Sequence, residues 1–232
     1  MRNRLMLSVV LGSVILLGCT KSAEGQKPTP SMIADSLLTI TDMEGDWKET
    51  QREAFDPREP ENPSIDPSLW CPEAIKVTKD LVDLAGETGS DVEMEFEGLD
   101  DGARMMRLQA WSNDDVDAYF ANASEAVRIC DGKTNTDEGG ATSTFAIVEN
   151  RDIGDESISW VQITRPPEGT GQDKFETVGR TTIARFGGII MVLQIGDFAP
   201  VGTGELMDED SWWEIVEKAS EKLDRLNSQV HD

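Results

Sequence analysis

Alternation of apolar and polar residues predicts β-strands at several places along the chain. Residues 91–97 alternate acidic and apolar side chains, and residues 104–111 resume an apolar alternation after a glycine-containing turn, so together they predict an antiparallel hairpin. Glu93 and Arg107 are expected to face each other on its solvent-exposed side. Residues 189–193 are apolar on both faces, which predicts a central strand covered on both sides. Further strands are predicted at residues 47–51, 143–149, 157–164 and 175–186, with the central strand extending to residue 195.

Apolar residues at helical spacing predict three main helices, at residues 72–86, 113–130 and 208–228. Asn113 is the expected N-cap of the second helix, and Cys130 lies on its apolar stripe. Together with the strands, these helices predict an α+β domain with a largely antiparallel sheet of about six or seven strands, packed by three main helices.

The sequence also predicts three local features of this domain. A short helical turn capped by Thr41 and ended by Gly45 should precede the first strand. Residues 131–140 have the composition of a loop. In the last helix Trp212 faces the core, whereas Trp213 lies about 100° further round the helix and is expected to be partly exposed.

The N-terminus has the layout of a signal peptide. Arg2 and Arg4 precede an apolar run from Leu5 to Leu17, a run of 13 residues, which is shorter than the roughly 20 needed to span a membrane. Leu16-Leu17-Gly18-Cys19 resembles the bacterial lipobox, and this resemblance implies cleavage before Cys19 and attachment of lipid to its thiol. An ordinary secretory signal with an incidental cysteine, or a soluble N-terminal helix, are the alternatives.

These features divide the chain into three parts. Residues 1–18 are the expected lipoprotein signal peptide, residues 19–31 a lipid-anchored flexible linker rich in small and polar residues, and residues 32–229 a single extracytoplasmic domain. The predicted location is therefore the extracytoplasmic face of the cell membrane, where two or three acyl chains would hold the protein stably.

The charge of the chain restricts its partners. It contains 45 acidic and 21 basic side chains, a formal net charge of −24. Such a chain repels a phosphate backbone and an anionic lipid surface, so we expect no nucleic-acid partner and no membrane binding through a basic patch. Membrane attachment is left to the lipid.

Cys71 and Cys130 are the remaining cysteines, and in an exported protein thiols usually pair. A disulfide between them would close a loop of about 60 residues and could stabilise the fold by roughly 4 kcal/mol. A redox-active or metal-binding pair is the alternative, but neither a CxxC spacing nor a nearby histidine accompanies it.

The sequence contains no recognisable catalytic motif. The only histidine, His231, lies next to the C-terminus, which argues against Ser-His-Asp, Cys-His and histidine-zinc chemistry. No nucleophile elbow, phosphate loop or dinucleotide fingerprint occurs. The acid-rich stretches 131–138 and 150–156 do not match a twelve-residue calcium loop, and acids such as Asp208 sit where they favour a helix dipole. We therefore predict no catalytic residue, no metal site and no cofactor.

Several stretches form a recognisable set: the lipobox around Cys19, residues 36–42 with Trp47 shortly after, the helix ending at Cys130, residues 154–160 before a long strand, and residues 186–193. Together they resemble the extracellular sensor-domain family of actinobacterial lipoproteins and PknH-type receptor kinases, over most of residues 36–226. The resemblance implies an antiparallel sheet packed by helices, an extracellular ligand and no known catalysis. It transfers no ligand-binding residue. Members of the kinase type usually have two disulfides, whereas this chain can form only the one already described.

The function expected from the sequence is extracytoplasmic binding or sensing of an unknown small molecule or envelope component, without catalysis. One alternative is a carrier of hydrophobic ligands, which needs an apolar cavity of several hundred Å³. A second is a glycan hydrolase, which needs two carboxyl groups about 5 to 9.5 Å apart across a cleft.

Overall fold

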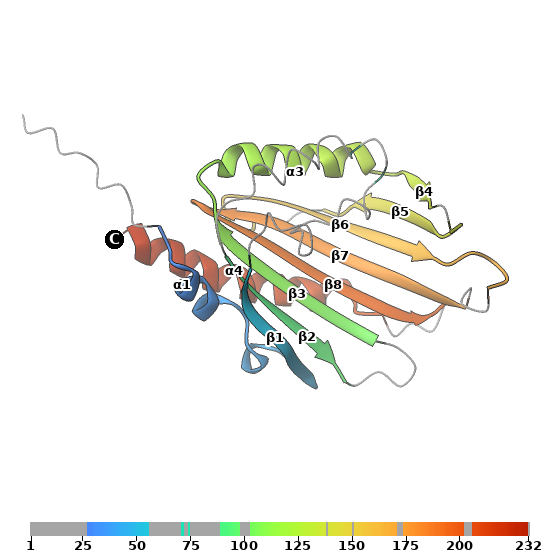
Figure 1. Ribbon diagram of the computed structural model, residues 1–232, viewed down its shortest axis with the longest axis horizontal. Helices are drawn as coiled ribbons and strands as arrows, with labels where there is room; N and C mark the ends of the chain where they lie inside the picture. The colour runs from blue at the N-terminus through green and yellow to red at the C-terminus, as the bar shows by residue number, and fades with distance from the viewer. Residues whose placement is uncertain are drawn as a thin grey trace, which may run out of the picture.

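A twisted antiparallel sheet organises the structure (Figure 1). The computed structural model describes residues 27–55, 71, 74, 89–97, 103–137, 139–149, 151–170, 174–201 and 206–231. Within these residues the strands are β1 (Trp47–Phe55), β2 (Gly89–Phe96), β3 (Ala103–Ser112), β4 (Thr134–Thr136), β5 (Thr142–Ile147), β6 (Glu156–Arg165), β7 (Phe175–Phe186) and β8 (Ile189–Pro200). The helices are α1 (Pro30–Ser36), the 3-10 helix η1 (Ile40–Asp42), α3 (Val116–Cys130) and α4 (Glu209–His231).

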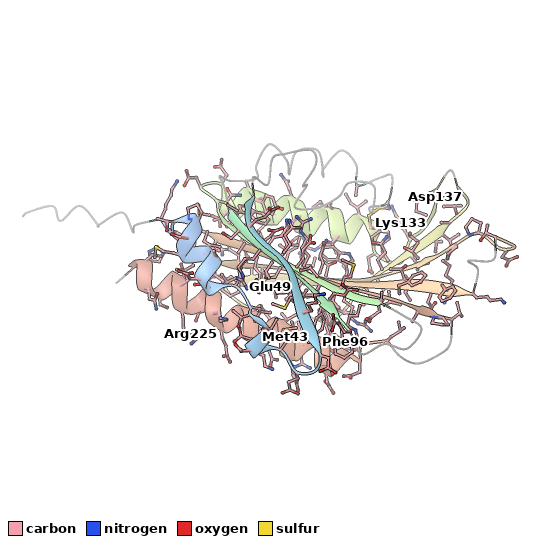
Figure 2. The ribbon with its side chains drawn as sticks, turned by 60° about the horizontal axis from the view of Figure 1, so that its bottom comes forward. Met43, Glu49, Phe96, Lys133, Asp137 and Arg225 are labelled. Carbon is pink, nitrogen blue, oxygen red and sulfur yellow. A yellow bond between two sulfur atoms is a disulfide. The ribbon has the colours of Figure 1, made fainter. Side chains whose placement is uncertain are left out.

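The sheet consists of two meanders joined side by side. Its strand order is β1-β2-β3-β8-β7-β6-β5-β4, and every neighbouring pair is antiparallel. Strands β1 to β3 form one meander and β4 to β8 the other, so the two meet only where β3 pairs with β8. Figure 2 shows Met43, Glu49 and Phe96 near β1, and Lys133 and Asp137 at the opposite edge, beside β4.

The α+β class and the antiparallel sheet are confirmed, but the expected strand count was too low. The described residues form eight strands rather than six or seven. The additional strand is β4, inside the stretch expected to be a loop. Three residues are too few to show an alternating pattern, and β4 forms because it pairs with β5 in a hairpin, where the Thr134 and Thr144 hydroxyls are 3.1 Å apart.

Both faces of the sheet are covered, but by different helices. Alternate residues of β8 show this division: Ile190 and Val192 belong to the core beneath α3, whereas Met191 and Leu193 belong to the core shared with α1 and α4. In Figure 1, α3 accordingly lies on one side of the sheet, and α4 and α1 lie on the other. Residues 189–193 are all buried, which confirms the prediction of a central strand.

Helix α4 buries a wider stripe than its spacing suggested. Trp212 and Trp213 are both buried, with ring centroids 4.3 Å apart. The expectation that Trp213 is partly exposed was therefore wrong. The guanidinium of Arg151 lies 5.2 Å from the centre of a Trp213 ring, and the indole N–H of Trp213 donates to the Glu209 carboxylate at 3.3 Å. A cation and a polar partner thus cover the side of the ring that the helix alone would have left exposed.

The chain enters the domain through α1 and η1. Helix α1 begins at Pro30, inside the stretch expected to be a linker, and the Thr29 hydroxyl accepts from the Met32 N–H. Thr39, rather than the expected Thr41, caps η1, because the Thr39 N–H and hydroxyl both donate to the Asp42 carboxylate, at 2.7 and 2.8 Å. Thr41 also has an acid three residues on, Glu44, so the pattern of a threonine followed by an acid fits both residues and did not decide between them.

Helix α3 carries the disulfide at its C-terminal end. Cys130 is its last residue and is bonded to Cys71, with the two Cα atoms 5.5 Å apart, so the predicted bridge is confirmed. The helix begins at Val116 rather than directly after Asn113, whose side-chain oxygen instead accepts from the Asp115 N–H at 2.8 Å. Of the helix predicted at residues 72–86, all but Ala74 lies outside the described residues.

Candidate functional site

The α3 side of the sheet changes character along the strands. Residues directly opposite each other in an antiparallel sheet point to the same face, so strand register defines rows across it. Ile158, Ile183 and Val192 form one such row, buried beneath α3. The next row contains Trp160, Thr181, Gln194 and Arg107. Trp160 still belongs to the core beneath α3. From β7 to β3, however, polar side chains replace the apolar ones and the surface is partly open.

Two glycines form the floor of this open surface. Gly179 on β7 and Gly196 on β8 are directly paired, and Gln162 on β6 and Met105 on β3 are their outer neighbours in the same row. Two central strands therefore carry no side chain here. Because neighbouring strands are about 4.8 Å apart, the gap between the flanking residues is roughly 14 Å wide.

Neither glycine is required by its backbone conformation. Both lie outside the group of glycines with positive φ. A Cβ added to Gly196 would meet nothing within 4 Å, and one added to Gly179 would meet only the Gln162 carbonyl oxygen, at 3.8 Å. Glycine in a strand interior costs stability, and at these two positions it leaves open space where another residue would place a side chain.

The resulting hollow, the open-face groove, has a volume of about 320 Å³. This is at the lower end of the range of roughly 300–1,000 Å³ that is typical of small-molecule sites. It is built on strands of a sheet, which hold side chains more rigidly than loops do. Its lining residues are Glu93, Met105, Met106, Arg107, Gln162, Thr164, Thr177, Gly179, Arg180, Thr181, Gln194, Ile195 and Gly196.

An ion-pair cluster closes the groove on the β2 side. Arg107 Nη2 donates to Asp91 Oδ2 at 2.8 Å, and its Nε lies 3.4 Å from Glu93 Oε1, which confirms the predicted Glu93–Arg107 cross-strand pair. Asp91 is buried, and its Oδ1 has no hydrogen-bond partner among the described residues; the same holds for Nε2 of its cross-strand neighbour Gln109. Arg107 is therefore held by two carboxylates from its own sheet.

Aromatic rings lie at the other end of the groove. Phe198 pairs with Thr177 across β8 and β7, one row beyond the glycines. Its ring stacks on that of Phe175, with centroids 5.0 Å apart and planes inclined by 7°. Phe198 is 42% exposed and Met105 is 54% exposed. Apolar surface thus predominates in and around the groove, with carboxamides and hydroxyls set into it.

Buried charge stabilises the opposite face behind the glycines. Asp197 follows Gly196 and is buried on the α4 side, where Arg104 Nε donates to Oδ1 at 2.5 Å and Arg180 Nη1 donates to Oδ2 at 3.2 Å. The Met207 N–H also donates to Oδ2, at 2.9 Å. These bonds fix β3, β7, β8 and the segment before α4 to one another, directly below the groove.

Apart from Glu93 and Arg107, the residues singled out from the sequence lie elsewhere. Cys19 is outside the described residues, and the Cys71–Cys130 bridge belongs to the core beneath α3. His231 lies near Lys27, at the opposite end of the sheet from the groove. Asp208 accepts from the Ser211 N–H at 2.8 Å, which is a helix-capping role. Its pKa is lowered by that backbone hydrogen bond first and by the Ser211 hydroxyl second.

The carboxylates of the acid-rich loops make local hydrogen bonds. Asp131 Oδ1 accepts from the Ile147 N–H, and Asp137 Oδ1 accepts from the Ala141 N–H, both at 2.9 Å. Across the described ranges, no cluster of three potential metal ligands occurs. Within the same residues, no helix has both the length and the apolar character needed to cross a membrane.

A second hollow, of about 360 Å³, lies between α1 and α4. Its lining includes the charged side chains of Asp35 on α1 and of Lys222 and Arg225 on α4. Lys222 is already bonded to Asp42, at 2.6 Å. This hollow is an ordinary crevice between packed helices. The open-face groove is the better candidate site, because two adjacent central strands have glycines on its floor.

Comparison with known proteins places the fold. The sequence matches no family model, and no curated protein matches it. The structure is similar to the crystal structure of the extracellular domain of PknH from Mycobacterium tuberculosis, with a TM-score of 0.54 and 10% identity, over 87% of this chain and 99% of that one. It also matches an Rv0999 ortholog from Mycobacterium smegmatis, with a TM-score of 0.41 and 12% identity, over 89% and 98% of the two chains.

At 10% identity, the PknH likeness establishes the fold alone. The chain therefore has the fold of the PknH extracellular domain, as the resemblance in its sequence implied. The lipoprotein features that belong to the same resemblance lie before residue 27, outside the described residues.

Proposed function

We propose that this protein is an extracytoplasmic binding module that takes its ligand in the open-face groove and carries out no turnover. The observation that carries the proposal is the paired glycine floor: Gly179 and Gly196 weaken the strands they belong to, and the space above them is what they provide. A fold shared with an extracellular domain supports the proposed location.

Anchoring by lipid on Cys19 completes the proposal. Lys27 and Pro28 lie beside Gly188 and the C-terminal end of α4, and Figure 1 shows the first described residues next to the C-terminus. Gly196 follows the turn residue Gly188 by eight positions along β8, a distance of about 26 Å at roughly 3.3 Å per residue. In a lipid-anchored protein the groove would thus lie well away from the end of the sheet at which the linker enters.

The alternative functions have less support. A carrier of hydrophobic ligands needs an enclosed apolar cavity, whereas the groove is an open strip whose mostly apolar surface is interrupted by carboxamides, hydroxyls and an ion pair. A two-carboxylate hydrolase needs a second acid across the cleft. Glu93 is the one carboxylate among the described lining residues, and it is paired with Arg107.

A thermal-shift screen of the mature domain tests the binding function. The probes are neutral oligosaccharides, sugar phosphates, phospholipids, short peptides and divalent cations, each with wild type and with Gly196→Val, which places a branched side chain on the floor of the groove. A ligand of the groove raises the melting temperature of wild type but not of Gly196→Val. Ala146→Val, on an exposed residue of β5 outside the groove lining, is the matched control and should respond as wild type does. If every active probe shifts all three proteins equally, the groove is not the binding site.

Mass spectrometry of membrane-extracted protein tests the anchor. We expect Cys19 as the first residue, carrying acyl chains. A mature chain whose N-terminal cysteine is unmodified would contradict the anchor and leave the groove untouched.

A further inference from the structure

The polar lining of the groove consists mainly of groups that both donate and accept hydrogen bonds. Gln162 and Gln194 supply carboxamides, and Thr164, Thr177 and Thr181 supply hydroxyls. Thr164 is 2.8 Å from the Ser143 hydroxyl, whereas no side-chain hydrogen bond joins the other four to a described residue. A ligand rich in hydroxyl groups suits such a surface, because every hydroxyl is itself both donor and acceptor.

The charges around the groove are already paired. Arg107 is held by Asp91 and Glu93, and Arg180 by Asp197 on the other face. An anionic ligand would have to compete with these carboxylates for either arginine, and the chain as a whole carries a net charge of −24. A cationic ligand that approached Glu93 would meet Arg107 beside it. The lining therefore favours an uncharged ligand.

The shape of the groove suits a flat ligand with an apolar face. The glycine floor exposes the backbones of two strands over a wide strip, and the stacked ring of Phe198 and the side chain of Met105 border that strip. A sugar ring has hydroxyls around its rim and C–H groups on its faces. It can therefore rest on the floor or against Phe198 while its rim meets Gln194 and the threonines.

We infer that the ligand class of the open-face groove is a neutral glycan, an inference that rests on the proposed binding function. An acyl chain in the same place would leave the carboxamides and hydroxyls without partners when water is displaced, which is unfavourable for each of them. The shared chemistry is the sugar, whether it comes as a free oligosaccharide or as the headgroup of a glycolipid.

Calorimetric titration of the mature domain tests this inference with two variants and one control variant. Gln194→Met keeps the side-chain length but removes the carboxamide, and Phe198→Ala removes the exposed ring. Gln229→Met, on an exposed residue of α4, is the matched control. We expect a neutral oligosaccharide to lose affinity about tenfold for Gln194→Met, the effect of one or two hydrogen bonds. Phe198→Ala should also weaken binding, and Gln229→Met should leave it unchanged.

Further titrations compare the two sources of the sugar and test the other classes of ligand. The same oligosaccharide should bind with similar affinity whether it is free or is the headgroup of a glycolipid in neutral vesicles. Its uronic or phosphorylated derivative should bind more weakly. A ligand that is blocked by Gly196→Val but is an anion, an acyl chain or a peptide would overturn the glycan inference and leave the binding function standing. If no probe of any class is sensitive to Gly196→Val, both fall together.

Discussion

Replacing Gly196 by alanine tests whether the fold itself requires this glycine or whether the glycine only leaves open space in the groove. The residue lies inside β8 without a positive φ, and an added Cβ would meet nothing within 4 Å. Glycine in a strand interior is destabilising by roughly 0.5–1 kcal/mol relative to alanine, because it loses more conformational freedom on folding. Gly196→Ala should therefore raise the free energy of unfolding by about that amount, and Gly196→Val should raise it at least as much.

Gly89 in β2 provides the opposite case in the same sheet. A Cβ there would lie 2.2 Å from the Ala110 carbonyl oxygen and 2.6 Å from the Trp111 Cβ. Backbone atoms cannot move aside cheaply, so Gly89→Ala should lower the free energy of unfolding by about 1–3 kcal/mol. The two identical substitutions are thus expected to change stability in opposite directions.

Urea unfolding followed by tryptophan fluorescence measures both effects. With a slope of about 2 kcal/mol per molar urea, Gly196→Ala should raise the midpoint by about 0.25–0.5 M, and Gly89→Ala should lower it, at unchanged slope. Ligand binding should be lost in Gly196→Val although that protein is the more stable one. A Gly196→Ala protein with a lowered midpoint would refute the reasoning, because the fold itself would then require the glycine.

Three further predictions concern stability. Reduction of the Cys71–Cys130 disulfide should lower the free energy of unfolding by up to about 4 kcal/mol, measured by urea unfolding with and without reductant. Asp197→Asn should cost about 3 kcal/mol or more, because it leaves buried arginines uncompensated; a loss equal to that of an exposed Asp→Asn change would argue against this. Burial alone would raise the pKa of Asp42, but hydrogen bonds from Lys222 and from the threonine cap outweigh it and hold the pKa below 3.8. Asp42→Asn should therefore cost about 1 kcal/mol at pH 7, and the difference from wild type should fade as the pH drops below 3.8; a penalty that persists in acid would contradict it.

The periodic parts of the fold could be predicted from the sequence, and the short or cooperative parts could not. The hairpin of β2 and β3, the central position of β8 and the disulfide follow from alternation, apolar runs and cysteine arithmetic. Strand β4 and the burial of Trp213 depend on contacts from other segments, namely β5 and Arg151. Local spacing contains no information about those partners.

The sequence pattern did not predict the glycine floor of the groove, because the predicted strand ended one residue before Gly196. The turn at residues 187 and 188 pairs Phe186 with Ile189, and the same register extended along both strands places Gly179 opposite Gly196. The strand expected from the sequence ended at Ile195, so the second glycine fell outside it. An isolated glycine in each of two hairpin strands, equally distant from the turn, was the available signal. The polar lining, by contrast, comes from five strands and requires the complete sheet order.

The junction between the two meanders gives the groove a mechanical meaning. Met105 and Gly196 are paired across that junction although 91 positions separate them in the chain, and bringing such distant segments together is entropically costly. A ligand resting on both strands would strengthen the pairing of β3 with β8, which joins the two meanders of the described sheet. A bound ligand would then raise the force needed to separate β3 from β8. A single-molecule pulling measurement would detect the bound state by that higher force.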